Sequence, residues 1–132
     1  MNIYFCGSMT GSQEKMYDYK ELIEYLKNYG TVLNEFVGEK IIDSDPNYIY
    51  KRDVNNLKQA DIVVADVSII STGVGFELGY ADNLNIRTLL IYDINKNSPS
   101  SLVLGNPNFT KMPYRNIEEA KENIKKFMAE NI

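Results

Sequence analysis

At 132 residues, the chain falls in the usual size range of one domain and is long enough to bury a core without disulfides or metals. Hydrophobic residues make up 44% and charged residues 24%, which excludes the disordered and fibrous classes. The net charge of −4 argues against nucleic-acid partners, because a phosphate backbone needs a basic face. A small anion held by local geometry is still allowed.

The chain contains no histidine, which excludes a Ser-His-Asp triad and a His-ligated zinc. Carboxylates must therefore carry any acid-base chemistry. The single cysteine, Cys6, lies in an apolar run, so we expect a buried thiol in a reducing compartment and no Cys-rich metal site. No apolar stretch approaches the roughly 18 residues of a membrane span, and no signal peptide is expected before the first strand. We expect a cytoplasmic protein with no membrane partner, no metal and no organic cofactor.

The first quarter of the chain predicts a strand, a turn, a helix and a second strand. Residues 3–6 form an apolar run that is typical of a strand, and the polar turn 7–12 follows it. Apolar residues then recur at three- and four-residue spacing, which predicts a helix that begins at Gln13 and stops at Gly30. Residues 31–34 are expected to form the second strand.

The middle of the chain continues the alternation of helices and strands. Asp45-Pro46 is a cap followed by a first-turn proline, and it predicts a helix to about Lys58 with Tyr50 on the inner stripe. Residues 62–65 are apolar throughout, as in a central parallel strand, and a helix is expected at 73–84.

The last third predicts two more strands and a terminal helix. Residues 88–92 form the fourth strand, and the irregular stretch 95–113 has room for a short helix and a fifth strand. Asn116 with Glu119 three residues later opens the last helix, as in a capping box. Strands thus alternate with helices throughout, which predicts one α/β domain over residues 1–132, with a parallel sheet covered by helices on both faces. Ligands of such folds bind at the carboxyl ends of the strands.

The turn Gly7-Ser8-Met9-Thr10-Gly11-Ser12 joins the first strand to the first helix, where free backbone N–H groups and the helix dipole favour an anion. Its glycine spacing and its lack of lysine fit neither a Walker loop nor a dinucleotide fingerprint. The alternative is a glycine-rich turn without a ligand.

The segment 71–79 lies where the third strand meets its helix, and its early glycines allow a ligand to approach the backbone. Glu77 falls about one turn into this helix, near the positive end, where a carboxylate is stabilised in its ionised form. It is therefore a candidate nucleophile, the alternative being a helix-capping glutamate. Asp53 on the preceding helix is placed to border the same rim, the alternative being a surface charge.

The chain resembles the nucleoside 2-deoxyribosyltransferase-like superfamily, and within it the 2'-deoxynucleoside 5'-monophosphate N-hydrolases, the Rcl family. The segments that carry the resemblance are 4–8, 30–33, Asp53 with Leu57, 60–65 and 71–79. The resemblance implies a flavodoxin-like, doubly wound, five-stranded parallel sheet, a homodimer with active sites near the interface, and a double displacement at C1' of the sugar.

The resemblance also implies roles for individual residues. Glu77 occupies the place of the nucleophile, Asp53 that of the acid which helps the base to leave, and Tyr4 that of the aromatic residue beside the sugar. The candidate substrate-binding residues are Gly7, Ser8, Met9, Thr10, Gly11, Ser71, Gly73, Ser100 and Phe36. The partner is thus a small nucleotide, with Ser100 expected to reach the neighbouring subunit's phosphate site and Ser101 as the second choice.

Two positions bear on the phosphate. Deoxyribosyltransferases that act on free nucleosides have a carboxylate where this chain has Ser71, and a serine can donate to a phosphate that a carboxylate would repel. Thr10 stands where the family often carries an arginine. The loss of that contact would weaken phosphate binding by roughly 1.5 to 3 kcal/mol, unless another cation compensates.

Three other functions stay open. The chain could be a transferase that passes the sugar to a second base, or a CMP-type ribonucleotide N-glycosidase, although Tyr4 favours deoxyribose. It could also be a nucleotide-binding module without activity, because flavodoxin-like folds host many functions. The preferred base is not predicted: Phe36 is placed to stack on a base, but it could equally belong to the core.

Overall fold

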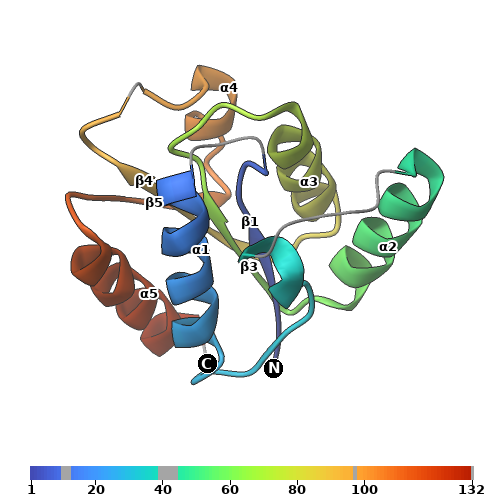
Figure 1. The fold of residues 1–132 in the computed structure, drawn as a ribbon, viewed down its shortest axis with the longest axis horizontal. Helices are drawn as coiled ribbons and strands as arrows, with labels where there is room; N and C mark the ends of the chain where they lie inside the picture. The colour runs from blue at the N-terminus through green and yellow to red at the C-terminus, as the bar shows by residue number, and fades with distance from the viewer. Residues whose placement is uncertain (10–12, 39–44, 97, 132) are drawn as a thin grey trace.

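The computed structural model describes residues 1–9, 13–38, 45–96 and 98–131. Five parallel strands form one sheet in the order β2-β1-β3-β4-β5 (Figure 1). The strands are β1 (Asn2–Cys6), β2 (Thr31–Val32), β3 (Ile62–Asp66), β4 (Arg87–Asp93) and β5 (Phe109–Tyr114). The helices are α1 (Gln13–Leu26), the 3-10 turn η1 (Glu35–Gly38), α2 (Pro46–Gln59), α3 (Thr72–Asn83), α4 (Ser101–Leu104) and α5 (Ile117–Asn131).

The sheet carries helices on both faces, which confirms the predicted doubly wound α/β fold. Side chains alternate along β1, so that Ile3 and Phe5 pack under α1 and α5, whereas Tyr4 and Cys6 pack under α2 and α3. Figure 1 shows α1 and α5 together on one side of the sheet and α2 and α3 on the other. The chain leaves β1 in one direction towards β2 and returns on its other side to β3, so the switch point of the fold lies between β1 and β3.

Most predicted elements are confirmed, and their caps explain their boundaries. Asp45 caps α2 and accepts a hydrogen bond from the backbone N–H of Asn47 at 3.1 Å. Asn116 caps α5 through the N–H of Glu119 at 2.9 Å. The irregular stretch before Asn116 holds the expected short helix and fifth strand.

Two predictions for the helices were wrong in detail. The first helix ends at Leu26 and not at Gly30. Gly30 instead allows a close approach, since a Cβ there would lie 2.2 Å from the carbonyl oxygen of Met1. Tyr50 does not belong to the inner stripe of α2, because its side chain is exposed and contacts the ring of Phe76.

The second strand is also shorter than the predicted residues 31–34. It ends at Val32, and the side chain of Asn34 replaces the missing strand pairing. The amide oxygen of Asn34 accepts from the N–H of Phe5 at 2.8 Å, and its amide nitrogen donates to the carbonyl oxygen of Phe5. A buried side chain thus satisfies the backbone of β1 just before the strand reaches the site.

Candidate active site

A cavity of about 640 Å³ opens at the carboxyl ends of β1 and β3, between α2, α3 and η1. Tyr4 reaches it from β1, Asp53 from α2 and Glu77 from α3. The structure therefore brings together the three residues that were predicted to be catalytic, at the switch point where ligands of this architecture bind.

The carboxyl group of Glu77 lies on the floor of this cavity and is held by β1. The hydroxyl of Tyr4 donates a hydrogen bond to Oε2 of Glu77, and the buried thiol of Cys6 lies near the same carboxyl group and lowers its pKa. Burial raises the pKa of Glu77 to about 7, against the hydrogen bond from Tyr4, and the negative charge of Asp53 raises it further. The helix dipole, which led us to expect a readily ionised group, is thus outweighed by desolvation.

Tyr4 is a fixed donor in this arrangement. Its side chain is almost fully buried, and burial, reinforced by the charge of Glu77, raises the pKa of its hydroxyl well above the usual range. The hydroxyl therefore stays protonated at neutral pH and donates a hydrogen bond to the carboxylate.

Asp53 faces the cavity beside a cation that the sequence analysis did not single out. Nε of Arg52 donates to Oδ1 of Asp53 at 2.9 Å. The guanidinium of Arg52 lies 4.1 Å from the ring centre of Phe36 and 5.6 Å from that of Tyr48. Phe36 itself is partly buried and lines the cavity, so it serves both the core and the site. No motif marks Arg52. Its place next to Asp53 in the sequence was the only signal that could have found it.

The N-terminus of α3 forms one end of the cavity. Ser71 caps the helix, and its Oγ accepts from the N–H of Val74 at 3.3 Å, which leaves its hydroxyl proton available to a ligand. Gly73 also lines the cavity, and the nearest atom to a Cβ built there would be Oγ of Ser71 at 3.8 Å. Packing within the chain therefore does not require glycine at this position, whereas an anion at the helix N-terminus would benefit from the open backbone.

The turn after β1 lies at the same end. Gly7 and Met9 line the cavity, and Ser8 is buried with its N–H donating to the hydroxyl of Tyr19 at 3.2 Å. A Cβ at Gly7 would lie 2.8 Å from the Tyr19 ring, so glycine is needed for this packing. The predicted substrate-binding residues Thr10 and Gly11 lie outside the described residues.

Ser100 does not line the cavity that contains Glu77. It is exposed, directly precedes α4 and borders a neighbouring cavity of about 430 Å³, which shares Ser71 with the first. Two exposed apolar side chains, Ile70 and Leu102, line this second cavity. Within one chain, Ser100 is therefore separate from the predicted catalytic residues.

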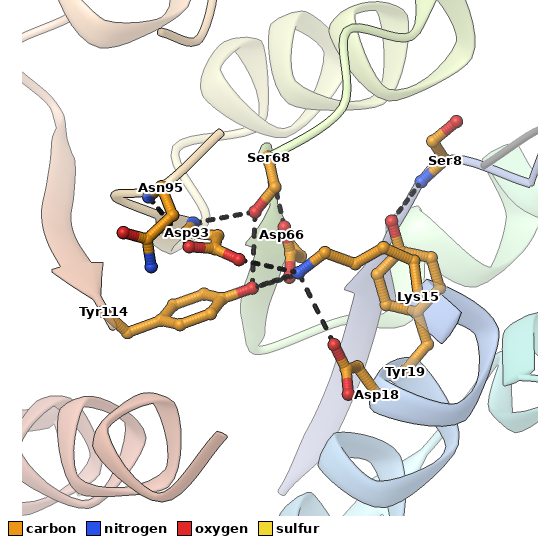
Figure 2. A network of polar contacts seen from close by, with 9 residues as sticks. All are labelled: Ser8, Lys15, Asp18, Tyr19, Asp66, Ser68, Asp93, Asn95 and Tyr114. Carbon is orange, nitrogen blue, oxygen red and sulfur yellow. Dashed lines mark hydrogen bonds and ion pairs between the residues drawn. The ribbon is translucent and has the colours of Figure 1, made fainter. Parts of the chain in front are cut away.

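A buried polar network lies at the carboxyl ends of β3, β4 and β5 (Figure 2). The ammonium group of Lys15 in α1 donates to the hydroxyl of Tyr114 at 2.7 Å and lies 3.8 Å from Asp66. The Tyr114 hydroxyl donates to Asp66 at 2.7 Å, and Asp18 and Asp93 lie 3.6 and 4.0 Å from the ammonium nitrogen. In the part of the chain that the structure describes, no group of three His, Cys, Asp or Glu side chains is placed to bind a metal.

Comparison with known proteins identifies the class to which this site belongs. A family model described as nucleoside 2-deoxyribosyltransferase matches residues 3–129, nearly the whole chain. The chain therefore belongs to the nucleoside 2-deoxyribosyltransferase family, and the resemblance that the sequence suggested is confirmed.

Particular relatives are named as nucleotide N-hydrolases. A protein of Syntrophotalea carbinolica, whose provisional name is 2'-deoxynucleoside 5'-phosphate N-hydrolase 1, is 33% identical over 98% of this chain and 96% of its own length. The 5-hydroxymethyl-dUMP N-hydrolase of Danio rerio is 41% identical over 70% of this chain and 68% of its own. The structure of a CMP N-glycosidase from Clostridium botulinum has the same fold, with a TM-score of 0.75, 18% identity and coverage of 96% of this chain and 99% of that one.

No helix among the described residues is long and apolar enough to span a bilayer.

Proposed function

We propose that this protein hydrolyses the N-glycosidic bond of 2'-deoxynucleoside 5'-monophosphates and releases the free base and deoxyribose 5-phosphate. The observation that carries the proposal is the pair of carboxyl groups, Glu77 and Asp53, that face one cavity beside the N-terminus of α3. Both relatives described above, one matched over nearly the whole chain and one over 70% of it, are named as nucleotide N-hydrolases, which supports the same chemistry.

Glu77 is the nucleophile of the first step. One of its oxygens bonds to C1' while the bond from C1' to the base nitrogen breaks, and the base leaves with the electron pair. Tyr4 holds Oε2, which leaves Oε1 for the attack. Because burial places the pKa of Glu77 near 7, its carboxylate is a stronger nucleophile than an exposed one and is still formed at neutral pH.

Asp53 is the acid of the first step. It delivers a proton to the departing base, while its Oδ1 is fixed by Arg52. Water then attacks the glycosyl ester at C1', Glu77 leaves as a carboxylate, and the water's proton returns to Asp53. No cofactor enters this cycle.

The phosphate is bound at the other end of the cavity, by the first turn of α3 and the turn after β1. Ser71 donates its hydroxyl proton, and backbone N–H groups of the two segments complete the site. A nucleotide bound in this way places its sugar over Tyr4 and Glu77.

The protein acts as a homodimer in this proposal, and the partner subunit's Ser100 completes the phosphate site. Support comes from the second cavity, where exposed Ile70 and Leu102 flank Ser71. Gly75 and Gly79 line the same cavity, and a Cβ at either position would meet nothing within 4 Å. An apolar surface with small residues allows a second copy to approach closely.

The test is base release, followed by chromatography, from deoxy- and ribonucleoside monophosphates and from free nucleosides. We expect release from deoxynucleotides, and we expect Glu77→Ala to abolish it while the circular dichroism spectrum stays unchanged. Asp53→Asn should slow turnover by roughly 10² to 10⁴, the usual contribution of general acid catalysis.

Other results would redirect the assignment. Release that needs an added acceptor base would make the protein a transferase, and release from CMP alone would make it a ribonucleotide N-glycosidase. A Glu77→Ala variant with near-normal rate would exclude the covalent mechanism. Nucleotide binding without any released base would leave a binding module.

A further inference from the structure

Arg52 faces the cavity but has no part in the bond-breaking steps above. Among the described residues that line the cavity, it carries the only positive charge. Its side chain is only 21% exposed, and it is fixed by Asp53 through Nε and by the ring of Phe36 beneath the guanidinium. A cation held so rigidly is suited to recognise a specific group of the ligand.

Arg52 lines the end of the cavity that would hold the base of a bound nucleotide. The phosphate site lies at the start of α3 and the turn after β1, and Glu77 must lie against C1'. The base therefore extends away from the phosphate, towards η1 and α2. This end of the cavity is lined by the rings of Phe36 and Tyr50, which suit the flat face of a base. Arg52 lines the same end, with its guanidinium 4.1 Å from the ring centre of Phe36.

The chemistry of the guanidinium restricts what it can recognise. Arginine has five N–H donors and no acceptor, and Nε is already used by Asp53. In the described part of the chain, its side chain has no other hydrogen bond or ion pair, so the terminal nitrogens can donate to a ligand. They can donate hydrogen bonds to a carbonyl oxygen of the base. An exocyclic amino group is itself a donor, so it would place two donors face to face.

We infer that Arg52 selects the base, favouring nucleotides whose base presents a carbonyl oxygen over those that present an amino group at the same position. The inference rests on the proposed function and specifies its substrate class. A merely structural role predicts something else. If Arg52 served only to position Asp53, its removal would lower the rate by the same factor for every base.

The experiment compares pairs of substrates that carry either a carbonyl oxygen or an amino group at the same exocyclic position, dUMP with dCMP and dIMP with dAMP. We expect the wild-type protein to favour the carbonyl member of each pair in kcat/KM by roughly tenfold or more. Arg52→Gln should bring both ratios close to one, because glutamine can both donate and accept. The matched control is Lys51→Gln, since Lys51 is an exposed cation next to Arg52 that does not line the cavity.

A binding measurement separates recognition from catalysis. In the Glu77→Ala background, we expect dUMP to bind more tightly than dCMP by calorimetry and the difference to disappear when Arg52→Gln is added. Equal loss of rate on all four substrates, with unchanged ratios, would overturn the inference. If the proposed function itself were wrong, the wild-type protein would release no base from any of the four nucleotides.

Discussion

At the scale of single residues, the central feature is a carboxyl group that is hard to ionise. Glu77 is enclosed by β1 and α3, and the hydrogen bond from Tyr4, the neighbouring thiol of Cys6 and the positive charge of Arg52 offset only part of the desolvation of its charge. Because the pKa of Glu77 is raised in the folded protein, the folded state holds a proton that the unfolded chain releases between about pH 4.5 and 7. Stability from this group is present at low pH and is lost as the pH rises through about 7.

We therefore expect Glu77→Gln to stabilise the protein at alkaline pH. Glutamine keeps the shape and accepts from Tyr4 without a buried charge, so the free energy of unfolding at pH 8 should rise by about 3 kcal/mol. Urea denaturation of both proteins at pH 8 and pH 4 measures this difference. The gain should shrink towards zero at pH 4, where Glu77 is protonated; an equal difference at both pH values would contradict the raised pKa.

At the scale of elements, α1 is joined to the sheet by charges as well as by apolar packing. Lys15 enters from the first turn of α1 and meets Asp66 at the end of β3 and Tyr114 at the end of β5 (Figure 2). The hydroxyl of Ser68 accepts from the N–H of Asp93, which extends the network to β4. The same helix supplies Tyr19 to the turn after β1. The network thus fixes the helix that follows the proposed phosphate-binding turn.

Removal of the Lys15 charge should destabilise the whole protein. Lys15→Met leaves Asp66 buried without its cation, and the loss of one partner of a buried pair costs about 3–5 kcal/mol. Urea denaturation measures the loss. Lys27→Met is the matched control, because Lys27 makes ion pairs with Glu24 and Glu35 on the surface, where solvent screens them.

The double variant Lys15→Met/Asp66→Asn distinguishes a charge effect from a packing effect. Part of the lost stability should return when the unpaired carboxylate is removed. If the double variant were as unstable as the sum of the two single variants, the ion pair would not be the cause.

At the scale of the whole molecule, the exposed apolar surface around α4 is relevant to the proposed dimer. Leu102 is 89% exposed and Ile70 72%, and both border the cavity that contains Ser100. If two copies meet there, each active site depends on its neighbour.

We expect Leu102→Lys to convert a dimer into monomers in sedimentation equilibrium. The kcat/KM for deoxynucleotides should then fall by roughly tenfold or more, because the phosphate loses a hydrogen bond worth about 1.5–3 kcal/mol. Ile94→Lys is the control, since Ile94 is also an exposed apolar residue but lines neither cavity. A wild-type protein that sediments as a monomer, or a monomeric variant with full activity, would exclude the shared site.

The sequence alone determined the order of the elements and the edge of the sheet on which the site lies. Apolar runs of four residues and stripes at helical spacing report burial directly, and a parallel sheet carries its ligand at the carboxyl ends of its strands. Glu77, Asp53 and Tyr4 could be selected because they lie in segments with recognisable spacing, and the family match confirms the resemblance that those segments carry.

Only the tertiary structure decided the electrostatics of the site. The raised pKa of Glu77 depends on its enclosure by β1, and the contact of the Arg52 guanidinium with the Phe36 ring depends on how α2 lies against η1. The network of Lys15 joins residues from helices and strands that are up to 99 positions apart in the chain. Sequence patterns report which residues are apolar and how they are spaced, whereas desolvation and charge pairing depend on distances across the fold, which no local pattern encodes.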